Sequence, residues 1–133
     1  MTTPAAPIVH QDPLIDRVEA YFSAVDQKDL GAILSFFTVD AVFTIATYNT
    51  VYRGRDVEIA GMFERLSARY ARIWHGEFHH VLQVPDRIAT RFNVENQHPD
   101  QPVVHKNNCN FFRTRGNLFD EVFVYMSGDN ALR

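Results

Sequence analysis

Residues 12–30 read DPLIDRVEAYFSAVDQKDL, and this stretch predicts a pair of helices at the start of the fold. Asp12 before Pro13 is a typical helix start, because the aspartate caps free N–H groups and proline suits the first helical position. Apolar residues then recur at helical spacing as far as Val25. We therefore expect a first helix over residues 13–27. Asp29 starts a shorter second helix, and the two are expected to form a hairpin.

The chain beyond this hairpin is mostly strand-like. Residues 88–96 alternate between an apolar face that includes Ile88 and Phe92 and a polar face that includes Arg91 and Asn93. A third helix is expected after the turn at 52–56, because the apolar residues between 59 and 70 form one stripe. Strands are expected over residues 40–48, 74–84, 88–96, 103–113 and 118–127. Helices combined with a run of antiparallel strands predict an α+β fold.

Length and charge limit the class of protein. A chain of 133 residues fits one domain, which we expect over residues 12–133. Residues 1–11 are rich in Pro, Ala and Thr and have neither a basic start nor an apolar core, so they are expected to be a flexible tail and not a secretory signal. The net charge of −3 argues against a nucleic-acid partner.

Two further totals bear on location and on the core. No apolar run approaches the ~20 residues that span a bilayer, so no membrane association is expected. The single cysteine, Cys109, allows no intramolecular disulfide and is typical of a reducing, cytoplasmic setting. Eleven phenylalanines are more aromatic surface than a plain core needs, which predicts an aromatic-lined cavity.

Four segments, in their order and spacing, resemble the NTF2-like superfamily in its SnoaL-like and ketosteroid-isomerase-like branches. They are AYFSAVD at 20–26 followed by Asp29-Leu30, Phe36-Phe37 before DAVF at 40–43, YRGRD at 52–56, and the stretch from Phe111 through Gly116-Asn117-Leu118. The resemblance implies a cone in which a curved antiparallel sheet wraps around three helices and encloses a mostly apolar pocket. The superfamily includes isomerases, dehydratases, cyclases, epoxide hydrolases and non-catalytic modules, so function has to be argued at the pocket.

Two residues match oxyanion-stabilising positions of the isomerases. Tyr21 stands where those enzymes carry a tyrosine, and a buried phenol can donate to a developing enolate. The alternative is a core tyrosine that fills a helix stripe. Asn108 stands near the second donor, and an amide can donate there at any pH. Asn107 and Asn110 lie in the same strand, where asparagine is disfavoured, so at least one of the three is expected in the pocket.

The chain lacks the catalytic carboxylates of two groups within the superfamily, the ketosteroid isomerases and the epoxide hydrolases. The isomerase base maps onto Ile45, which cannot take a proton, so steroid isomerisation of the usual kind is not expected. Arg91-Phe92-Asn93 resembles the Arg-x-Asp of the epoxide-hydrolase members, but an amide replaces the carboxylate that would activate water.

A histidine pair carries the remaining acid/base candidate. His79-His80-Val81-Leu82-Gln83 resembles the early third-strand pattern of the dehydratase-like members, and this resemblance favours His79 as the acid/base. Strand alternation puts His79 and His80 on opposite faces without saying which points inward. The dehydratase aspartate on the first helix maps near Ser23, so its partner is missing, and Glu77 or Glu95 is the substitute.

Metal binding is not expected from these histidines. His75 and His79 would share a strand face but lie about 13 Å apart, which is too far to share an ion.

Substrate contacts are expected from both polar and apolar side chains. Arg91 and Asn93 are expected to face the interior and orient a substrate, and the alternative is a solvent-facing polar stripe. The apolar wall of the pocket is expected to come from Phe43, Ile45, Phe63 and Tyr125.

The sequence leaves two functions open. The first is an enzyme that catalyses a proton shift, dehydration or cyclisation, without a cofactor, on a small apolar or aromatic metabolite. His79, Tyr21 and Asn108 would then aim at one point. The second is a non-catalytic ligand-binding or dimerisation module. Family members commonly pair through the outer face of the sheet, so a homodimer is expected, with contacts from those of Trp74, Phe78, Phe123 and Tyr125 that face outward.

Overall fold

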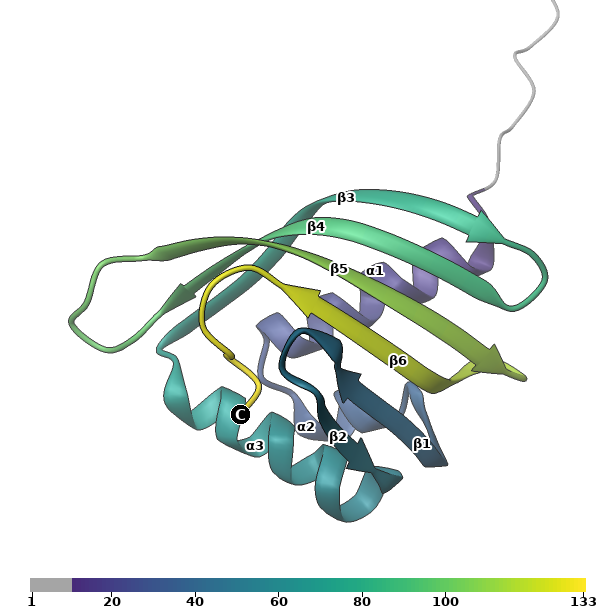
Figure 1. Cartoon of the computed structure of the whole chain (residues 1–133), viewed down its shortest axis with the longest axis horizontal. Coiled ribbons are helices and arrows are strands. Elements are labelled where there is room, and N and C mark those ends of the chain that lie inside the picture. The colour runs from purple at the N-terminus through teal and green to yellow at the C-terminus, as the bar shows by residue number, and fades with distance from the viewer. Residues whose placement is uncertain (1–10) are drawn as a thin grey trace, which may run out of the picture.

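The computed structural model describes residues 11–133, so the predicted tail lies almost entirely outside the described residues. The helices are α1 (Pro13–Asp26), α2 (Leu30–Leu34) and α3 (Ala60–Arg69) (Figure 1). Asp12 caps α1 as predicted, since its Oδ1 accepts the Leu14 N–H at 2.8 Å. Asp29 caps α2 in the same way, accepting the Ala32 N–H at 3.1 Å. The helical hairpin is therefore set by two aspartates that satisfy otherwise unpaired N–H groups.

Six strands form one curved sheet in the order β2-β1-β6-β5-β4-β3. Their bounds are β1 Phe37–Ile45, β2 Thr50–Arg53, β3 Arg72–Gln83, β4 Arg87–Gln97, β5 Val104–Arg115 and β6 Leu118–Met126. Neighbouring strands run antiparallel except β1 and β6, which are parallel. The predicted α+β cone is confirmed, with this one parallel pair inside a sheet expected to be antiparallel throughout.

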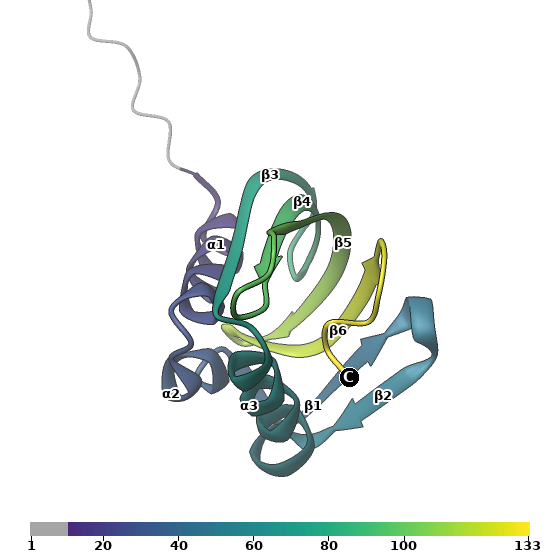
Figure 2. The ribbon, with the colours of Figure 1, turned by 90° about the vertical axis from the view of Figure 1, so that its left-hand side faces the viewer.

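The sheet bends into an open half-barrel with its helices on the inner side. In Figure 2, α1 runs along β3, α3 lies across the open side, and the C-terminal stretch after β6 turns toward α3. A π-helical turn, Gly54–Ile59, leads into α3. The inner face of the sheet is therefore covered by helices, whereas its outer face is not covered by any described element.

Phenylalanine side chains fill much of the space between sheet and helices. Seven of them are at most 2% exposed: Phe22, Phe37, Phe43, Phe63, Phe92, Phe112 and Phe119. Tyr21 lies among these rings, and its ring centre is 5.6 Å from those of Phe37 and Phe119. The aromatic surplus of the sequence therefore packs the interior more than it lines an open cavity.

A β-bulge in β3 changes which side chains point inward. Gly76 pairs with Asn93 and His79 with Arg91, so Glu77 and Phe78 together face the single residue Phe92. Glu77 has a φ of 55°, in the left-handed region. The additional residue shifts the alternation by one position. As a result His75 points inward before the bulge, and after it Phe78 and His80 do.

Candidate functional site

A histidine and an aspartate meet where the end of α1 reaches β3. Nδ1 of His75 lies 2.5 Å from Oδ1 of Asp26, and Oδ2 of the same carboxylate accepts the His75 backbone N–H at 3.1 Å. The two side chains are 11% and 21% exposed, so water screens the pair only in part. The carboxylate holds the ring so that a neutral imidazole carries its proton on Nδ1 and its lone pair on Nε2. Among residues 11–133, no hydrogen bond engages Nε2.

His75 borders two small cavities inside the cone. One has a volume of about 40 Å³ and the other about 30 Å³, so each has room for only a few water molecules. Both are lined by Leu66, His75, Asn108 and Leu132. The smaller one also touches Tyr21 and the rings of Phe22, Phe43, Phe63 and Phe92. An imidazole, a phenol and an amide thus border one hollow with aromatic walls.

Tyr21 is held as a neutral phenol. Its side chain is 2% exposed, and burial followed by the charge of Asp26 raises its pKa well above the ordinary value. Both causes disfavour the phenolate. At physiological pH the hydroxyl is therefore a hydrogen-bond donor beside the smaller cavity.

Two asparagines on the inner face of β5 have unsatisfied oxygens. The Oδ1 atoms of Asn108 and Asn110 are buried and find no hydrogen-bond partner among residues 11–133. Asn110 is only 3% exposed, and both residues line the smaller cavity. A buried polar atom without a partner is costly, so these two oxygens are places where a water molecule or a ligand group can bind.

His80 points inward, but it has a different environment from His75. Its Nδ1 lies 2.8 Å from Oγ1 of Thr90, and its Nε2 lies 3.2 Å from Oε1 of Glu19. Both ring nitrogens are thus engaged, and His80 does not line either inner cavity. It ties α1 to two strands of the sheet.

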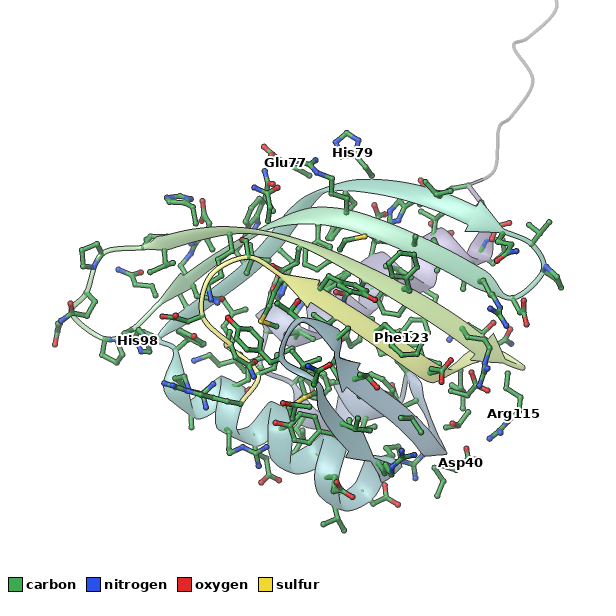
Figure 3. The ribbon with its side chains drawn as sticks, viewed as in Figure 1. Asp40, Glu77, His79, His98, Arg115 and Phe123 are labelled. Carbon is green, nitrogen blue, oxygen red and sulfur yellow. The ribbon has the colours of Figure 1, made fainter. Side chains whose placement is uncertain are left out.

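The structure does not bring His79 together with Tyr21 and Asn108. His79 is exposed on the outer side of β3, and Figure 3 shows it projecting outward from that strand beside Glu77. The reason is the bulge at Glu77 and Phe78, because without it His75 and His79 would share a face. Of the three residues predicted to aim at one point, Tyr21 and Asn108 line the smaller cavity and His79 does not. His75 lines that cavity instead.

Arg91 and Asn93 also lie on the outer face, not in the interior. Nη2 of Arg91 donates to Oδ1 of Asn107 at 3.0 Å, and Nδ2 of Asn93 donates to a carboxylate oxygen of Glu77. The inner positions of β4 belong to the alternating set that includes Phe92. The alternative of a solvent-facing polar stripe describes these residues correctly.

The four residues predicted to form the apolar wall divide into three groups. Phe43 and Phe63 line the smaller inner cavity. Ile45 is fully buried in the core without bordering either inner cavity. Tyr125 is 49% exposed on the outer face of β6.

The pair of His75 and Asp26 was missed by sequence reasoning, which placed Asp26 in the segment 20–26 that resembles the family and considered His75 only for metal binding, which it did not expect. A signal was present. Asp26 is the last residue of α1, where the helix dipole disfavours a carboxylate, so an aspartate there is expected to have a cationic or donor partner. Only the fold identifies that partner.

The outer face carries an apolar groove. It has a volume of about 590 Å³ and lies over β3 to β6, where its lining includes Val81, Ala89, Phe111, Phe123 and Tyr125. Arg113 and Glu121 supply charges of both signs in it. Of the aromatics predicted for such a face, Phe123 and Tyr125 point outward, whereas Phe78 stacks on Phe22 inside, with ring centres 5.3 Å apart. Trp74 lines a separate outer hollow.

The curved sheet, the three helices and the inner hollow define an α+β cone of the ketosteroid-isomerase-like type. The chain belongs to the SnoaL-like domain family, whose model matches residues 18–122. No curated protein sequence matches the chain.

Solved structures with the same fold are numerous. One is a protein from Xanthomonas campestris pv. campestris, proposed to be a polyketide cyclase, with 20% identity, a TM-score of 0.75 and coverage of 85% of this chain and 89% of that one. A second, from Catenulispora acidiphila, has a ketosteroid isomerase-like fold and was solved with trimethylamine. It shows 16% identity, a TM-score of 0.76 and 88% coverage of both chains. A third, from Novosphingobium aromaticivorans, is proposed to be an aromatic ring hydroxylase, with 25% identity, a TM-score of 0.70 and coverage of 88% and 91%.

Within residues 11–133, no group of three or more His, Cys, Asp or Glu side chains lies close enough to hold a metal ion. No helix in that range combines the length and the apolar character needed to cross a membrane.

Proposed function

We propose that this chain is a SnoaL-like enzyme that catalyses a proton shift, dehydration or cyclisation, without a cofactor, on a small apolar carbonyl or hydroxyl compound. The observation that carries the proposal is the contact of His75 with Asp26 at the edge of the inner hollow. An imidazole held by a carboxylate through Nδ1, with Nε2 left free, is the arrangement that general acid–base catalysis needs.

The chemistry assigns one role to each of four residues. Nε2 of His75 takes a proton from a carbon next to a carbonyl, and Asp26 stabilises the imidazolium that forms. The carbonyl oxygen becomes an enolate oxygen and accepts hydrogen bonds from the Tyr21 hydroxyl and the Asn108 amide. His75 then returns the proton to another carbon in an isomerisation, or to a leaving hydroxyl in a dehydration. Phe43 and Phe63 supply apolar walls.

The walls of the hollow and the structural relatives both favour one class of substrate. Aromatic side chains favour a flat, apolar compound. Relatives with the same fold are proposed to be polyketide cyclases, which supports a carbonyl-rich metabolite.

The acid/base role of His75 can be tested without knowing the natural substrate. A panel of cyclic ketones, including β-tetralone, is incubated with the protein in heavy water, and the loss of α-protons is followed by NMR. We expect exchange above the buffer rate, and a loss of roughly a hundredfold or more in His75→Gln. His79→Gln is the matched control, since its side chain is exposed on the outer face, and it should exchange as fast as the wild type. Equal rates in wild type and His75→Gln would contradict the proposal.

A non-catalytic binding module is the second candidate, and one observation favours it. The inner cavities of about 40 and 30 Å³ are small for a metabolite. If no ketone in the panel exchanges faster than in buffer while small aromatic compounds still bind, this second function replaces the first.

We also propose that two copies pair through the outer groove. Phe111 and Tyr125 are 47% and 49% exposed there, a large apolar surface to leave in water. A two-fold pairing sets the same patch against itself, and the groove carries both signs of charge in Arg113 and Glu121, as self-complementarity requires.

Light scattering after size-exclusion chromatography tests this pairing. We expect a dimer for the wild type and a monomer for Phe111→Glu. The control is Val57→Glu, because Val57 is exposed in the turn before α3 and lies outside the groove. A monomeric wild type at high concentration would contradict the pairing.

The location we propose is the cytoplasm, on the basis of the single cysteine.

A further inference from the structure

The stretch that follows β6 covers the open end of the inner hollow. Residues 128–133 leave the sheet and turn toward α3, as Figures 1 and 2 both show. Ala131 is 7% exposed, and Leu132 lines both inner cavities beside His75 and Asn108. The side chain of Leu132 therefore takes up space between the hollow and solvent.

Side chains of the cone hold this segment by its main chain. The Tyr52 hydroxyl on β2 donates to the Leu132 carbonyl oxygen at 2.9 Å. Arg69 on α3 donates to main-chain oxygens of Ala131 and Arg133, the latter at 2.6 Å. Nζ of Lys106 on β5 donates to the Asp129 carbonyl oxygen at 2.6 Å. The Tyr52 bond is a neutral one of modest strength, whereas those from Arg69 and Lys106 come from charged donors and are stronger.

The segment is not part of the sheet. The last ladder contact of β6 is at Met126, and the Ser127 N–H donates to the Asn107 carbonyl at 3.1 Å. Within residues 11–133, no backbone N–H or C=O of residues 128–133 bonds to a strand backbone. The segment can therefore leave the hollow without breaking a strand pairing.

The hollow behind Leu132 contains two amide oxygens that accept no hydrogen bond from residues 11–133. Oδ1 of Asn110 and Oδ1 of Asn108 are buried without a partner, and a leucine side chain cannot supply one. The walls around these oxygens are phenyl rings. An aromatic compound with a hydroxyl group would satisfy both features, since its ring packs on the walls and its O–H donates to an amide oxygen.

We propose that residues 128–133 act as a removable plug, and that the hollow which opens when Leu132 leaves binds a hydroxylated aromatic compound with its O–H donated to Asn110 or Asn108. The inference rests on the proposed function, because it concerns the same site, and it adds the ligand class and the control of access. When a plug competes with the ligand, the apparent association constant equals the intrinsic one multiplied by the fraction of molecules in which the plug is open.

Binding of two matched probes to three proteins tests the proposal. β-Naphthol has the hydroxyl, and its methyl ether has the same rings without a donor. Isothermal titration is carried out on the wild type, on Leu132→Gly, and on Arg133→Gly as a control that alters the same segment at an exposed position. We expect Leu132→Gly to bind β-naphthol about tenfold more tightly than the wild type, and Arg133→Gly to bind like the wild type.

The hydroxyl preference is tested in the opened protein. In Leu132→Gly, β-naphthol should bind about tenfold more tightly than its methyl ether, and the additional change Asn110→Leu should remove that difference. Equal affinities of wild type and Leu132→Gly would overturn the plug. Equal affinities of the two probes in Leu132→Gly would overturn the hydroxyl acceptor.

A second variant opens the segment more gently. Tyr52→Phe keeps the ring and removes only the hydroxyl that holds the Leu132 carbonyl, so it should also bind β-naphthol more tightly than the wild type, by a smaller factor. If it binds no more tightly, the plug is again overturned. These binding experiments involve no proton transfer from carbon. A failure here therefore leaves the exchange result on His75 unaffected, and a failure of that exchange leaves the binding result unaffected.

Discussion

Two inward-pointing histidines lie on either side of the bulge in β3, and they differ in how many ring nitrogens have a hydrogen-bond partner. Both are paired with a carboxylate of α1, His75 with Asp26 and His80 with Glu19. His80 uses both ring nitrogens, because Thr90 occupies the second. His75 uses one and borders the inner cavities. The comparison shows that a buried imidazole–carboxylate pair becomes a candidate for chemistry when one nitrogen is left free beside a hollow, and a structural tie when neither is.

Exchanging the carboxylates for amides gives the largest expected contrast. Asp26→Asn removes the charge that stabilises the His75 imidazolium, so proton exchange from ketones should fall by roughly a hundredfold or more. Glu19→Gln should leave that rate near the wild-type value and lower the free energy of unfolding by about 0.5–1 kcal/mol, as expected for a hydrogen bond whose carboxylate is 39% exposed. NMR exchange and urea unfolding measure the two effects. A similar loss of rate in both variants would remove the distinction between the two histidines.

A side chain at Gly76, next to the bulge in β3, should disturb both histidine–carboxylate pairs. A Cβ at Gly76 would lie 2.2 Å from the Trp74 ring, so Gly76→Ala forces the ring to move and should cost about 1–3 kcal/mol of stability. Trp74 is the single tryptophan of the chain, so its fluorescence reports the displacement directly. Gly31→Ala is the matched control, because the nearest atom to its added Cβ is an aspartate oxygen 3.8 Å away. Equal stability of the two variants would contradict the close contact.

The smallest effect is expected at an exposed ion pair. Asp40 and Arg115 lie together at one end of the sheet (Figure 3), and the hydrogen bonds that Arg115 donates lower the pKa of Asp40 to about 2. Because the folded pKa lies below the usual 3.8, the stabilisation is complete above about pH 4 and is lost as the pH falls toward 2. Arg115→Ala should return the pKa toward its usual value with little effect on stability at neutral pH. A carboxyl NMR titration measures the shift, and an unchanged pKa would contradict the pairing.

The sequence was sufficient for the three helices, for five of the six strands and for the family, because those depend on local patterns, whereas the short strand β2 was given no range. Asp12-Pro13 predicted the start of α1, and the alternation in residues 88–96 predicted β4. The site was harder, because it depends on one additional residue in β3. Periodicity alone puts His75 and His79 on one face, and nothing in the pattern around Gly76 and Glu77 indicates a bulge. The partner of Asp26 follows from how α1 crosses β3, which is a tertiary property.

The place of β6 in the sheet has a consequence for how the chain folds. Among the six strands within residues 11–133 it is the last along the chain, yet it lies in the middle of the sheet, where it joins the β1–β2 hairpin to the β3–β5 meander. Contacts between β1 and β6 connect residues as distant as Phe37 and Phe119. Such non-local pairing raises the contact order and slows folding. On the ribosome, both halves of the sheet must therefore wait with an unpaired edge until β6 emerges, and that interval is when the chain is most exposed to aggregation.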